Sequence, residues 1–530
     1  MPAAPTDLVH GSFSDTPPWT LDRPGDLVWR RGLVAVRQRL RAEVPHLVAP
    51  RRLPPGRRVA AVSRQLGTAV GAWWLRERRR RDRSASRAGI SRRLRLAAER
   101  LGPTYIKLGQ IISSGEGIFP PELVDEFKLC RDQVPPEPFD VVREVVEGDL
   151  GRPLEEVFRS FDRTALAAAS IAQVHAATLR TGESVVVKVQ RPAVARLVHQ
   201  DLRAMAWLAT RLVGRIPVAA LANPPALVEL FAQTIAEELD FRLEAENMLD
   251  IARTFAELDQ RGYVIPRPHP ELVTPRVLVM ERLDGFAFDD VVGMRGAGLD
   301  TEAIVRTGMI GFLEGAILLG IFHGDLHSGN LVVLPDGRTG LLDFGITGRL
   351  DEPRRRAFLR LLLGGAGNDV MAQLVALRDL GALPPDADLD RVVRELDLDR
   401  PPVDPTSLTP DQLVGEIQRL VKGLLGIGAR FPKELMLLVK NLMFLDGAIA
   451  RLAPDLDLFA EIAAISLHFA TVHGDRIFAD VGIDPRAVDL DLSALRASVG
   501  ADDESQPLTH RELQRRRQQL RDNLARNRRR

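Results

Sequence analysis

The sequence is poor in cysteine and in aromatic residues. Its 530 residues include one cysteine, Cys130, and aromatic side chains make up 5 % of the chain. A single cysteine excludes an intramolecular disulfide and any zinc cluster built from cysteines. We therefore expect a reducing compartment, with Cys130 serving as a small buried hydrophobe rather than as a reactive thiol.

The sequence also lacks apolar segments of the kind that target or anchor a chain. Its first residues show no basic region followed by an apolar one, so we expect no secretory signal. The most apolar stretch, residues 309–322, contains Glu314 and is shorter than the roughly 20 residues that span a bilayer. We therefore expect a cytoplasmic protein, with peripheral contact at the inner face of the plasma membrane as an open alternative.

Charge is balanced overall but unevenly distributed. The formal net charge is +1, yet arginine is concentrated near the two ends of the chain. The basic run 76–87 follows Trp73 and Trp74, a combination suited to an anionic lipid surface. The alternative is a solvated helix face beside two buried indoles. No zinc motif or aromatic-interleaved basic groove accompanies the arginines, so we expect no nucleic-acid partner.

Composition and periodicity divide the chain into six segments. They are a disordered N-terminus (1–25), a basic helical region (26–90), a helical extension (91–152), a β-rich lobe (153–285), a helical lobe (286–475) and a helical, basic tail (476–530). In the extension, Gly102-Pro103 should separate two short helices.

Alternating, β-branched residues begin at about residue 154. The runs IAQVHAATL and SVVVKVQ are separated by a turn that contains Gly182 and Glu183, which predicts a hairpin. Residues 276–285 suit a further strand, and 331–345 suit a second hairpin. Everything after residue 351 reads as helical.

The strongest chemical signal is the sequence HGDLHSGN, residues 323–330, followed by Asp-Phe-Gly. Asn330 follows Asp325 by five positions, and Asp343 follows Asn330 by thirteen. Phosphoryl transfer needs a carboxylate that orients the attacking hydroxyl and oxygen ligands that hold Mg²⁺ against the phosphates. This spacing matches the catalytic loop and DFG of protein kinases. We therefore predict that Asp325 is catalytic and that Asn330 and Asp343 bind the metal.

Lys188 ends the strand SVVVK and matches the lysine that contacts nucleotide phosphates in kinases. Its ammonium needs a carboxylate partner, and the segment 225–247, read as one helix, offers several. We expect Glu244 to be that partner, with Glu238 as the second choice.

The loop before this hairpin departs from an ordinary kinase, because it contains no glycine from Thr164 to His175. Alanine restricts φ, so the loop should form a stiffer lid over the phosphates, with a serine hydroxyl as a donor. The predicted nucleotide-binding residues are Ala167, Ala168, Ala169, Ser170 and Lys188, together with Met280 and Glu281 on the hinge strand.

Together these motifs resemble the ABC1/ADCK/UbiB family of atypical kinases over roughly residues 90–460. The resemblance rests on Lys107 to Gln110 (the KxGQ motif), the alanine-rich loop, VVVKVQRP at 185–192, Glu238-Leu239-Asp240 (the ExD motif), HGDLHSGN and DFG. It implies an α+β, bilobal protein-kinase-like fold, with a small β-lobe, a helical large lobe and an N-terminal helical extension over the active site. It also implies functional roles for Lys107, Gln110, Glu238 and Asp240, with Glu238 and Asp240 near Lys107.

The family resemblance implies an ATPase or kinase that uses ATP (or ADP) and Mg²⁺. Its function would support isoprenoid quinone biosynthesis or lipid homeostasis, with an anionic membrane surface or proteins of that pathway as partners. Two alternatives stay open. The HGDLH form is closer to small-molecule phosphotransferases of the aminoglycoside kinase type, which suggests a lipid or metabolite kinase. The third reading is a nucleotide-sensing scaffold without turnover.

Overall fold

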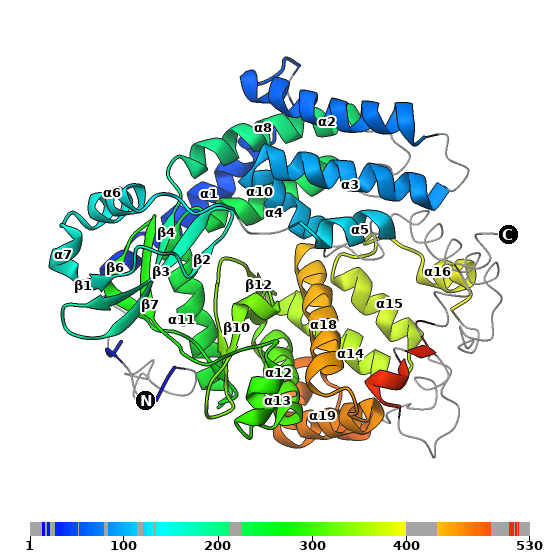
Figure 1. The fold of residues 1–530 in the computed structure, drawn as a ribbon. Helices are drawn as coiled ribbons and strands as arrows, with labels where there is room; N and C mark the ends of the chain where they lie inside the picture. Colours follow the sequence, from blue (N-terminus) through cyan, green and yellow to red (C-terminus); the bar gives the residue numbers. More distant parts are fainter. Residues whose placement is uncertain are drawn as a thin grey trace. The chain divides into compact units, whose positions relative to one another are not determined.

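The computed structural model describes residues 13–15, 18–21, 27–50, 52–78, 83–113, 120–130, 134–212, 224–398, 432–488, 508–513, 515–516 and 518. The chain divides into two compact units (Figure 1). The first contains residues 1–252, 265–283 and 343–346, and the second contains 253–264, 284–342 and 347–530. The Asp-Phe-Gly sequence therefore belongs to the first unit, and the HGDLHSGN loop belongs to the second.

The first unit is built around an antiparallel sheet with the strand order β1-β3-β4-β7-β6, and β2 pairs with β3. The strands are β1 (Phe158–Phe161), β2 (Ala167–Ala168), β3 (Ala172–Leu179), β4 (Ser184–Gln190), β6 (Pro268–Val273) and β7 (Val277–Glu281). The turn between β3 and β4 contains Gly182 at φ +109°, a conformation that favours glycine. The predicted first hairpin is thus confirmed.

Side-chain alternation along β4 decides which way Lys188 points. Val185, Val187 and Val189 are buried in one apolar cluster with valines of α6 (Phe139–Leu150). Because successive side chains of a strand point to opposite faces, Lys188 lies on the other face of the sheet.

Helices make up most of the remaining first unit (Figure 1). They are α1 (Leu33–Leu47), α2 (Arg57–Arg76), α3 (Arg83–Leu101), α4 (Pro103–Ser113), α5 (Pro121–Lys128), α6, α7 (Leu154–Val157), α8 (Val194–Leu212), α10 (Pro224–Glu238) and α11 (Phe241–Glu257), after a short 3₁₀ turn, η1 (Val28–Arg30). The helices α3 and α4 meet at Gly102, which has φ +101°, so the predicted break between two helices is confirmed. The ion pair between Arg58 of α2 and the buried Asp201 of α8, at 2.5 Å, joins the basic helical region to α8.

Part of the segment expected to be disordered packs on the sheet. Phe13 is 2 % exposed, and its ring lies 4.8 Å from the Arg267 guanidinium. The Trp19 indole donates to the Pro268 carbonyl oxygen at 3.0 Å. The other residues of 1–25 lie outside the described residues, apart from those at 14–15, 18 and 20–21.

The sequence reads residues 225–247 as one helix, but the structure has two. α10 ends at Glu238 and α11 begins at Phe241. The Asp240 carboxylate accepts from the backbone N–H of Arg242 at 3.1 Å and from its guanidinium at 2.6 Å. This capping arrangement satisfies a backbone donor at the start of α11 and ends the continuous helix. The interpretation of residues 225–247 as one continuous helix is therefore wrong.

The second unit contains two small sheets and a set of helices. One sheet has the order β5-β11-β10-β8, and the other pairs β12 with β9. The strands are β5 (Tyr263–Val264), β8 (Phe286–Ala287), β9 (Ile321–His323), β10 (Leu331–Val333), β11 (Thr339–Leu341) and β12 (Thr347–Arg349). The antiparallel pairing of β10 with β11 confirms the second predicted hairpin.

Its helices are α12 (Val291–Gly296), α13 (Thr301–Glu314), the π-helical turn η2 (Gly315–Leu319), the 3₁₀ turn η3 (Ser328–Asn330), α14 (Glu352–Ala366), α15 (Val370–Asp379), α16 (Leu389–Leu396), α18 (Lys433–Leu452), α19 (Leu458–Val472), α20 (Gly474–Val481) and the 3₁₀ turn η4 (Pro485–Ala487). The helical expectation after residue 351 holds for these segments. The basic runs at 79–82 and 519–530 lie outside the described residues. Within the described part of the chain, no helix is long and apolar enough to cross a membrane.

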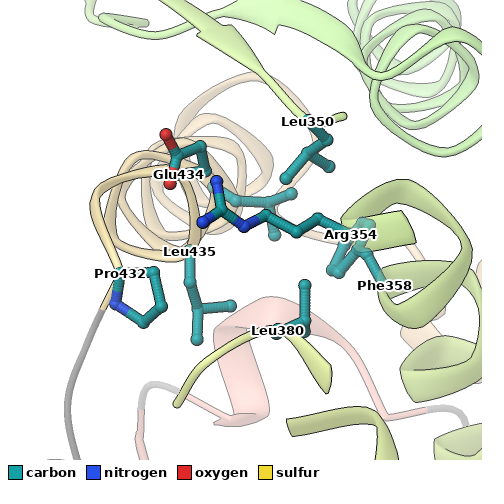
Figure 2. A pocket seen from close by; sticks show the side chains of 8 residues that line it. Leu350, Arg354, Phe358, Leu380, Pro432, Glu434 and Leu435 are labelled. Atoms are coloured by element: carbon teal, nitrogen blue, oxygen red, sulfur yellow. The ribbon is translucent and has the colours of Figure 1, made fainter. Parts of the chain in front are cut away.

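A small pocket of the second unit lies between α14 and α18 (Figure 2). Its walls are largely apolar, and Arg354 extends across it toward Glu434. As the structure describes it, none of the residues predicted for catalysis or nucleotide binding lines this pocket.

Candidate active site

The centre of the first unit's polar cluster is the Lys188 ammonium. Its Nζ lies 2.7 Å from Glu244 Oε1 and 3.1 Å from Asp343 Oδ2. The lysine side chain is 8 % exposed. Burial alone would lower the pKa of Lys188, but the negative charges of Asp343 and Glu244 outweigh it and hold the pKa above its ordinary value. Lys188 is therefore a fixed positive charge.

Glu244 joins this lysine to the Asp-Phe-Gly segment. Its Oε1 also accepts a hydrogen bond from the backbone N–H of Phe344 at 3.2 Å. One turn further along α11, the Asn247 side chain donates to the Phe344 carbonyl oxygen at 2.9 Å. Glu244 is thus the Lys188 partner expected from the sequence, and α11 holds both the lysine and the DFG backbone.

Asp343 adopts a backbone conformation that is uncommon outside glycine. Its φ is +56°, in the left-handed region. Its Oδ1 accepts from the Gly345 N–H at 3.1 Å, while Oδ2 faces Lys188. The side chain nevertheless stays 45 % exposed, which leaves its oxygens accessible to a ligand.

The KxGQ helix contributes a second lysine to this cluster. Lys107 Nζ lies 3.1 Å from Glu238 Oε2, and the two side chains are 13 % and 4 % exposed. A Cβ atom on Gly345 would lie 3.3 Å from Glu238 Cγ, so Glu238 packs against the DFG glycine. Lys107 and Glu238 are therefore brought together, as expected. Gln110 lies one turn further along α4.

Gly109, between Lys107 and Gln110, permits close packing of α4 on α5. A Cβ atom there would lie 2.6 Å from the Phe127 ring and 3.4 Å from Cys130 Sγ. A side chain at position 109 would therefore clash with Phe127, and Cys130 beside it is buried.

Asp240 contacts the start of α11, and its nearness to Lys107 stays a prediction. Its carboxylate is held by the Arg242 guanidinium, with Nη2 at 2.6 Å from Oδ2 and Nε at 2.9 Å from Oδ1. The physical reason is the helix break described above, which makes Asp240 a cap for α11.

The alanine-rich loop forms a tight turn between β2 and β3. The Ala169 N–H donates to the Ala172 carbonyl oxygen at 2.8 Å, and Ser170 is buried. Arg191 holds the outer side of this turn, because its Nε donates to the Ala169 carbonyl oxygen at 3.0 Å. The same guanidinium contacts Glu137 at 2.9 Å. These bonds hold the backbone at Ala169, and the predicted role of this loop as a stiff lid stays a prediction.

The predicted hinge residues have different surroundings. Met280 is buried in β7. The Glu281 carboxylate is engaged by Ser14 and by the backbone N–H of Arg267, the latter at 3.1 Å. The Glu281 side chain is thus part of the structural contact with the N-terminal segment, and a nucleotide contact there would fall to backbone atoms.

Two predicted site residues of the second unit, Asp325 and Asn330, lie in the HGDLHSGN loop. Lys440 of α18 forms a short ion pair with Asp325 Oδ1. The Asn330 amide donates to the Asp325 carbonyl oxygen at 3.0 Å, which leaves its Oδ1 as the acceptor end. The Leu342 N–H donates to the Asn330 carbonyl oxygen at 2.8 Å. Leu342 is the residue before Asp343, so this bond joins the end of the HGDLHSGN loop to the residue that precedes DFG.

His323 and Asn441 fix the conformation of this loop. The Asp325 N–H donates to His323 Nδ1 at 3.2 Å, which assigns the ring proton to Nε2, 3.2 Å from the Leu342 carbonyl oxygen. Asn441 accepts from the Leu326 N–H at 3.1 Å and donates to the His323 carbonyl oxygen. The HGDLHSGN loop is therefore positioned by α18.

Sequence reasoning missed four residues of this arrangement: Lys440, Asn441, Arg191 and Asn247. One signal was available. Asn441 is 0 % exposed in an otherwise apolar helix face, and a buried amide needs partners. Lys440 and Asn441 interrupt the apolar sequence LMLLVKNLMFL, so the sequence could show that two polar residues lie in a buried helix. It could not show that they contact the HGDLHSGN loop.

The oxygen donors suit a hard divalent cation. Asp343 offers a carboxylate and Asn330 an amide oxygen, the ligand types that Mg²⁺ uses together with phosphate oxygens. The fixed Lys188 charge can stabilise phosphate oxygens. Each of these side chains is therefore of a type that can contact a magnesium–nucleotide complex.

Comparison with known proteins agrees with these motifs. The model of the ABC1 atypical kinase-like domain matches residues 129–374. An uncharacterized protein of Mycobacterium tuberculosis is 37 % identical over 364 residues, covering 67 % of this chain and 73 % of that protein. An uncharacterized chloroplastic aarF domain-containing protein kinase of Arabidopsis thaliana is 33 % identical over 395 residues, covering 69 % of this chain and 73 % of that protein.

A probable protein kinase UbiB of Aliivibrio salmonicida is 32 % identical over 401 residues, covering 74 % of this chain and 71 % of that protein. Among solved structures, a complex of a Mycobacterium tuberculosis protein with erythromycin is 22 % identical, with a TM-score of 0.36 over 65 % of this chain and 91 % of that one. A TM-score below 0.5 does not establish a common fold. The family match and the relatives show that the chain belongs to the ABC1 atypical kinases and has their kinase-like α+β fold.

Proposed function

We propose that the protein binds Mg²⁺-ATP and hydrolyses it or transfers its terminal phosphoryl group. The observation that carries this proposal is the buried Lys188 ammonium held between Glu244 and Asp343. In kinases a strand lysine paired with a helix glutamate contacts the phosphates, and the DFG aspartate holds the metal, which matches Lys188 with Glu244 and Asp343 beside them.

The proposed roles follow from the chemistry of each side chain. Lys188 neutralises phosphate oxygens, and Asn330 and Asp343 supply oxygens to the metal ion. Asp325 orients the attacking hydroxyl or water. When bound, Mg²⁺ would neutralise charge on the phosphates. Lys440, the ion-pair partner of Asp325, would hold that carboxylate until substrate is in place.

We further propose that this activity supports isoprenoid quinone biosynthesis or lipid homeostasis, as membership of the family suggests. An ATPase assay on the purified chain, with and without anionic liposomes, tests the enzymatic part. Magnesium-dependent ATP turnover that rises with liposomes supports the proposal. Absence of both nucleotide binding and turnover would refute it.

Lys107→Ala is expected to raise ATP turnover severalfold, because the substitution removes the positive charge that Lys107 places beside the DFG segment. The change removes the ion pair of the buried Glu238 carboxylate with Lys107, which costs about 3 kcal/mol of folding stability. Turnover and thermal unfolding are measured on this variant and on Lys107→Ala/Glu238→Gln, which should recover stability. Lys128→Ala, an exposed lysine of α5, serves as control. Unchanged turnover in folded Lys107→Ala would contradict the role of this lysine.

The HGDLH sequence favours a second candidate, a kinase for a lipid or metabolite hydroxyl. The two functions differ in their product. Mass spectrometry of a lipid and metabolite extract incubated with the protein and ATP would show a new phosphomonoester for such a kinase and free phosphate alone for an ATPase.

Peripheral membrane contact is proposed at the C-terminal end of α2. The Trp73 indole donates to the Ser86 carbonyl oxygen at 3.0 Å, so it belongs to the packing of α2 on α3. Trp74 and Leu75 are 52 % and 76 % exposed instead. An exposed indole beside arginines suits the headgroup layer of an anionic membrane.

Trp74→Ala/Leu75→Ala should therefore reduce flotation with anionic liposomes severalfold, since it removes the apolar part of this contact. Leu467→Ala, which truncates an exposed leucine of the second unit, should float like the wild type. Equal flotation of wild type with neutral and anionic vesicles would remove the electrostatic part of the proposal.

A further inference from the structure

Two histidines and a glutamate from separate segments of the second unit meet at one point. His468 lies in α19, His473 between α19 and α20, and Glu314 at the end of α13. Glu314 Oε1 is 3.1 Å from His468 Nε2 and 2.9 Å from His473 Nε2. The three ligand-type atoms all lie within 4.8 Å of one another.

The burial of these side chains is unlike that of an ordinary surface cluster. The Glu314 and His473 side chains are 4 % and 9 % exposed, and that of His468 is 32 % exposed. A buried carboxylate and a buried imidazole thus face a third group that solvent can reach. Packing therefore fixes Glu314 and His473, and an ion can enter from the side of the partly exposed His468.

The separations are close to those of a tetrahedral zinc site. Zn–N and Zn–O bonds of about 2.0–2.1 Å place neighbouring ligand atoms ~3.3 Å apart. The two nitrogen–oxygen distances here are shorter by a few tenths of an ångström, a shift that side-chain rotation can supply. Two imidazoles and one carboxylate are the ligands of zinc sites that keep a fourth position for water.

An outer contact orients the carboxylate. Gln260 Nε2 donates to Glu314 Oε2 at 2.6 Å, and Gln260 Oε1 accepts from the Gly262 N–H at 2.7 Å. Glu314 Oε2 is therefore directed to the glutamine, while Oε1 is directed to both histidines. Outer hydrogen bonds of this kind fix ligand orientation in metal sites. The π-helical turn η2 begins directly after Glu314, and such turns are frequent at functional sites.

We propose that Glu314, His468 and His473 bind a divalent transition-metal ion, with Zn²⁺ the best fit and water at the fourth position. Nitrogen ligands distinguish this site from the all-oxygen site proposed for Mg²⁺. The bound ion would join α13 to the segment that links α19 and α20. The proposal stands apart from the nucleotide chemistry, because none of its residues belongs to the kinase motifs.

The fold offers a variant that should stay folded. Arg306 of α13 contacts Glu461 of α19 at 2.6 Å, so α13 and α19 remain joined when His468 is removed. His468→Ala is the test variant because its side chain is partly exposed. His199→Ala is the matched control, since the His199 side chain is also 32 % exposed and also faces a glutamate.

The experiment uses untagged full-length protein, stripped with EDTA and then dialysed against zinc chloride or magnesium chloride. Metal content is measured by mass spectrometry, and thermal unfolding is followed with and without each metal. Wild type and His199→Ala should each retain about one zinc ion per chain and unfold at a higher temperature with zinc than with EDTA. His468→Ala should bind zinc about tenfold more weakly or worse, and magnesium should cause no shift.

A tetrahedral cobalt spectrum after Co²⁺ substitution, lost in His468→Ala, would give independent support. Three outcomes overturn the proposal: no zinc retained by wild type, equal zinc affinity in wild type and His468→Ala, or an equal zinc-induced shift in both. Any of these would make the cluster a hydrogen-bonded structural contact. They leave the ATP proposal untouched, because nucleotide binding is not the readout.

Discussion

Replacing Asp343 with asparagine is expected to abolish magnesium-dependent nucleotide binding, weakening it by about 100-fold or more, which corresponds to ~2.7 kcal/mol. The substitution keeps the size of the side chain. Asparagine also tolerates the left-handed backbone found at this position, where φ is +56°. The substitution removes one negative charge. The metal ion then loses a carboxylate ligand, and Lys188 loses its ion pair with Asp343 while it keeps the one with Glu244.

The binding of fluorescent ADP or ATP, titrated with and without Mg²⁺, measures this effect. Asp336→Asn is the matched control, since its side chain is 47 % exposed against 45 % for Asp343 and it is also paired with a basic side chain. The control should bind as wild type does. If folded Asp343→Asn bound the magnesium–nucleotide complex with unchanged affinity, the metal role of Asp343 would be wrong.

Asp325→Asn is expected to lower ATP turnover by about 10²–10⁴-fold while nucleotide affinity stays within a few-fold of wild type. The reason is that Asp325 acts on the attacking hydroxyl or water and not on the bound phosphates. Its amide substitute cannot accept the proton, although it can still contact Lys440. The split between turnover and affinity separates this role from a structural one.

Asp480→Asn provides the control for the loss of a half-buried ion pair. Asp480 pairs with Arg355 at 2.6 Å and is 18 % exposed, against 16 % for Asp325. This control should lose stability but keep turnover per folded molecule. Single-turnover assays, with the protein in excess over ATP, give the rate. Retained turnover in Asp325→Asn would contradict a catalytic Asp325 and would favour a scaffold that binds nucleotide without using it.

The sequence predicts the structure correctly where the conformation depends on neighbouring residues. The strand bearing Lys188 follows from alternation, since Val185, Val187 and Val189 fill one face. The hairpin at Gly182 follows from the turn residues. The choice of Glu244 as the Lys188 partner was correct, although the single-helix argument behind it was not.

Long-range contacts could not be obtained in this way. The periodic pattern of α10 and α11 continues through Asp240 without a glycine or proline, and the break depends on one side chain capping the next helix. Lys440 lies 115 positions from Asp325, so nothing local links them. The same holds for Glu314 and the two histidines more than 150 positions later.

The coupling between Asn330 and Asp343 tests the central claim most directly, because the account gives both residues the same metal ion. Magnesium–ATP affinity is measured for wild type, Asn330→Ala, Asp343→Asn and the double variant. We predict that each single change nearly abolishes magnesium-dependent binding and that the double variant binds no worse than either, since the shared ion is already lost. Independent, additive losses, or ATP binding that EDTA leaves unchanged in wild type, would contradict the account.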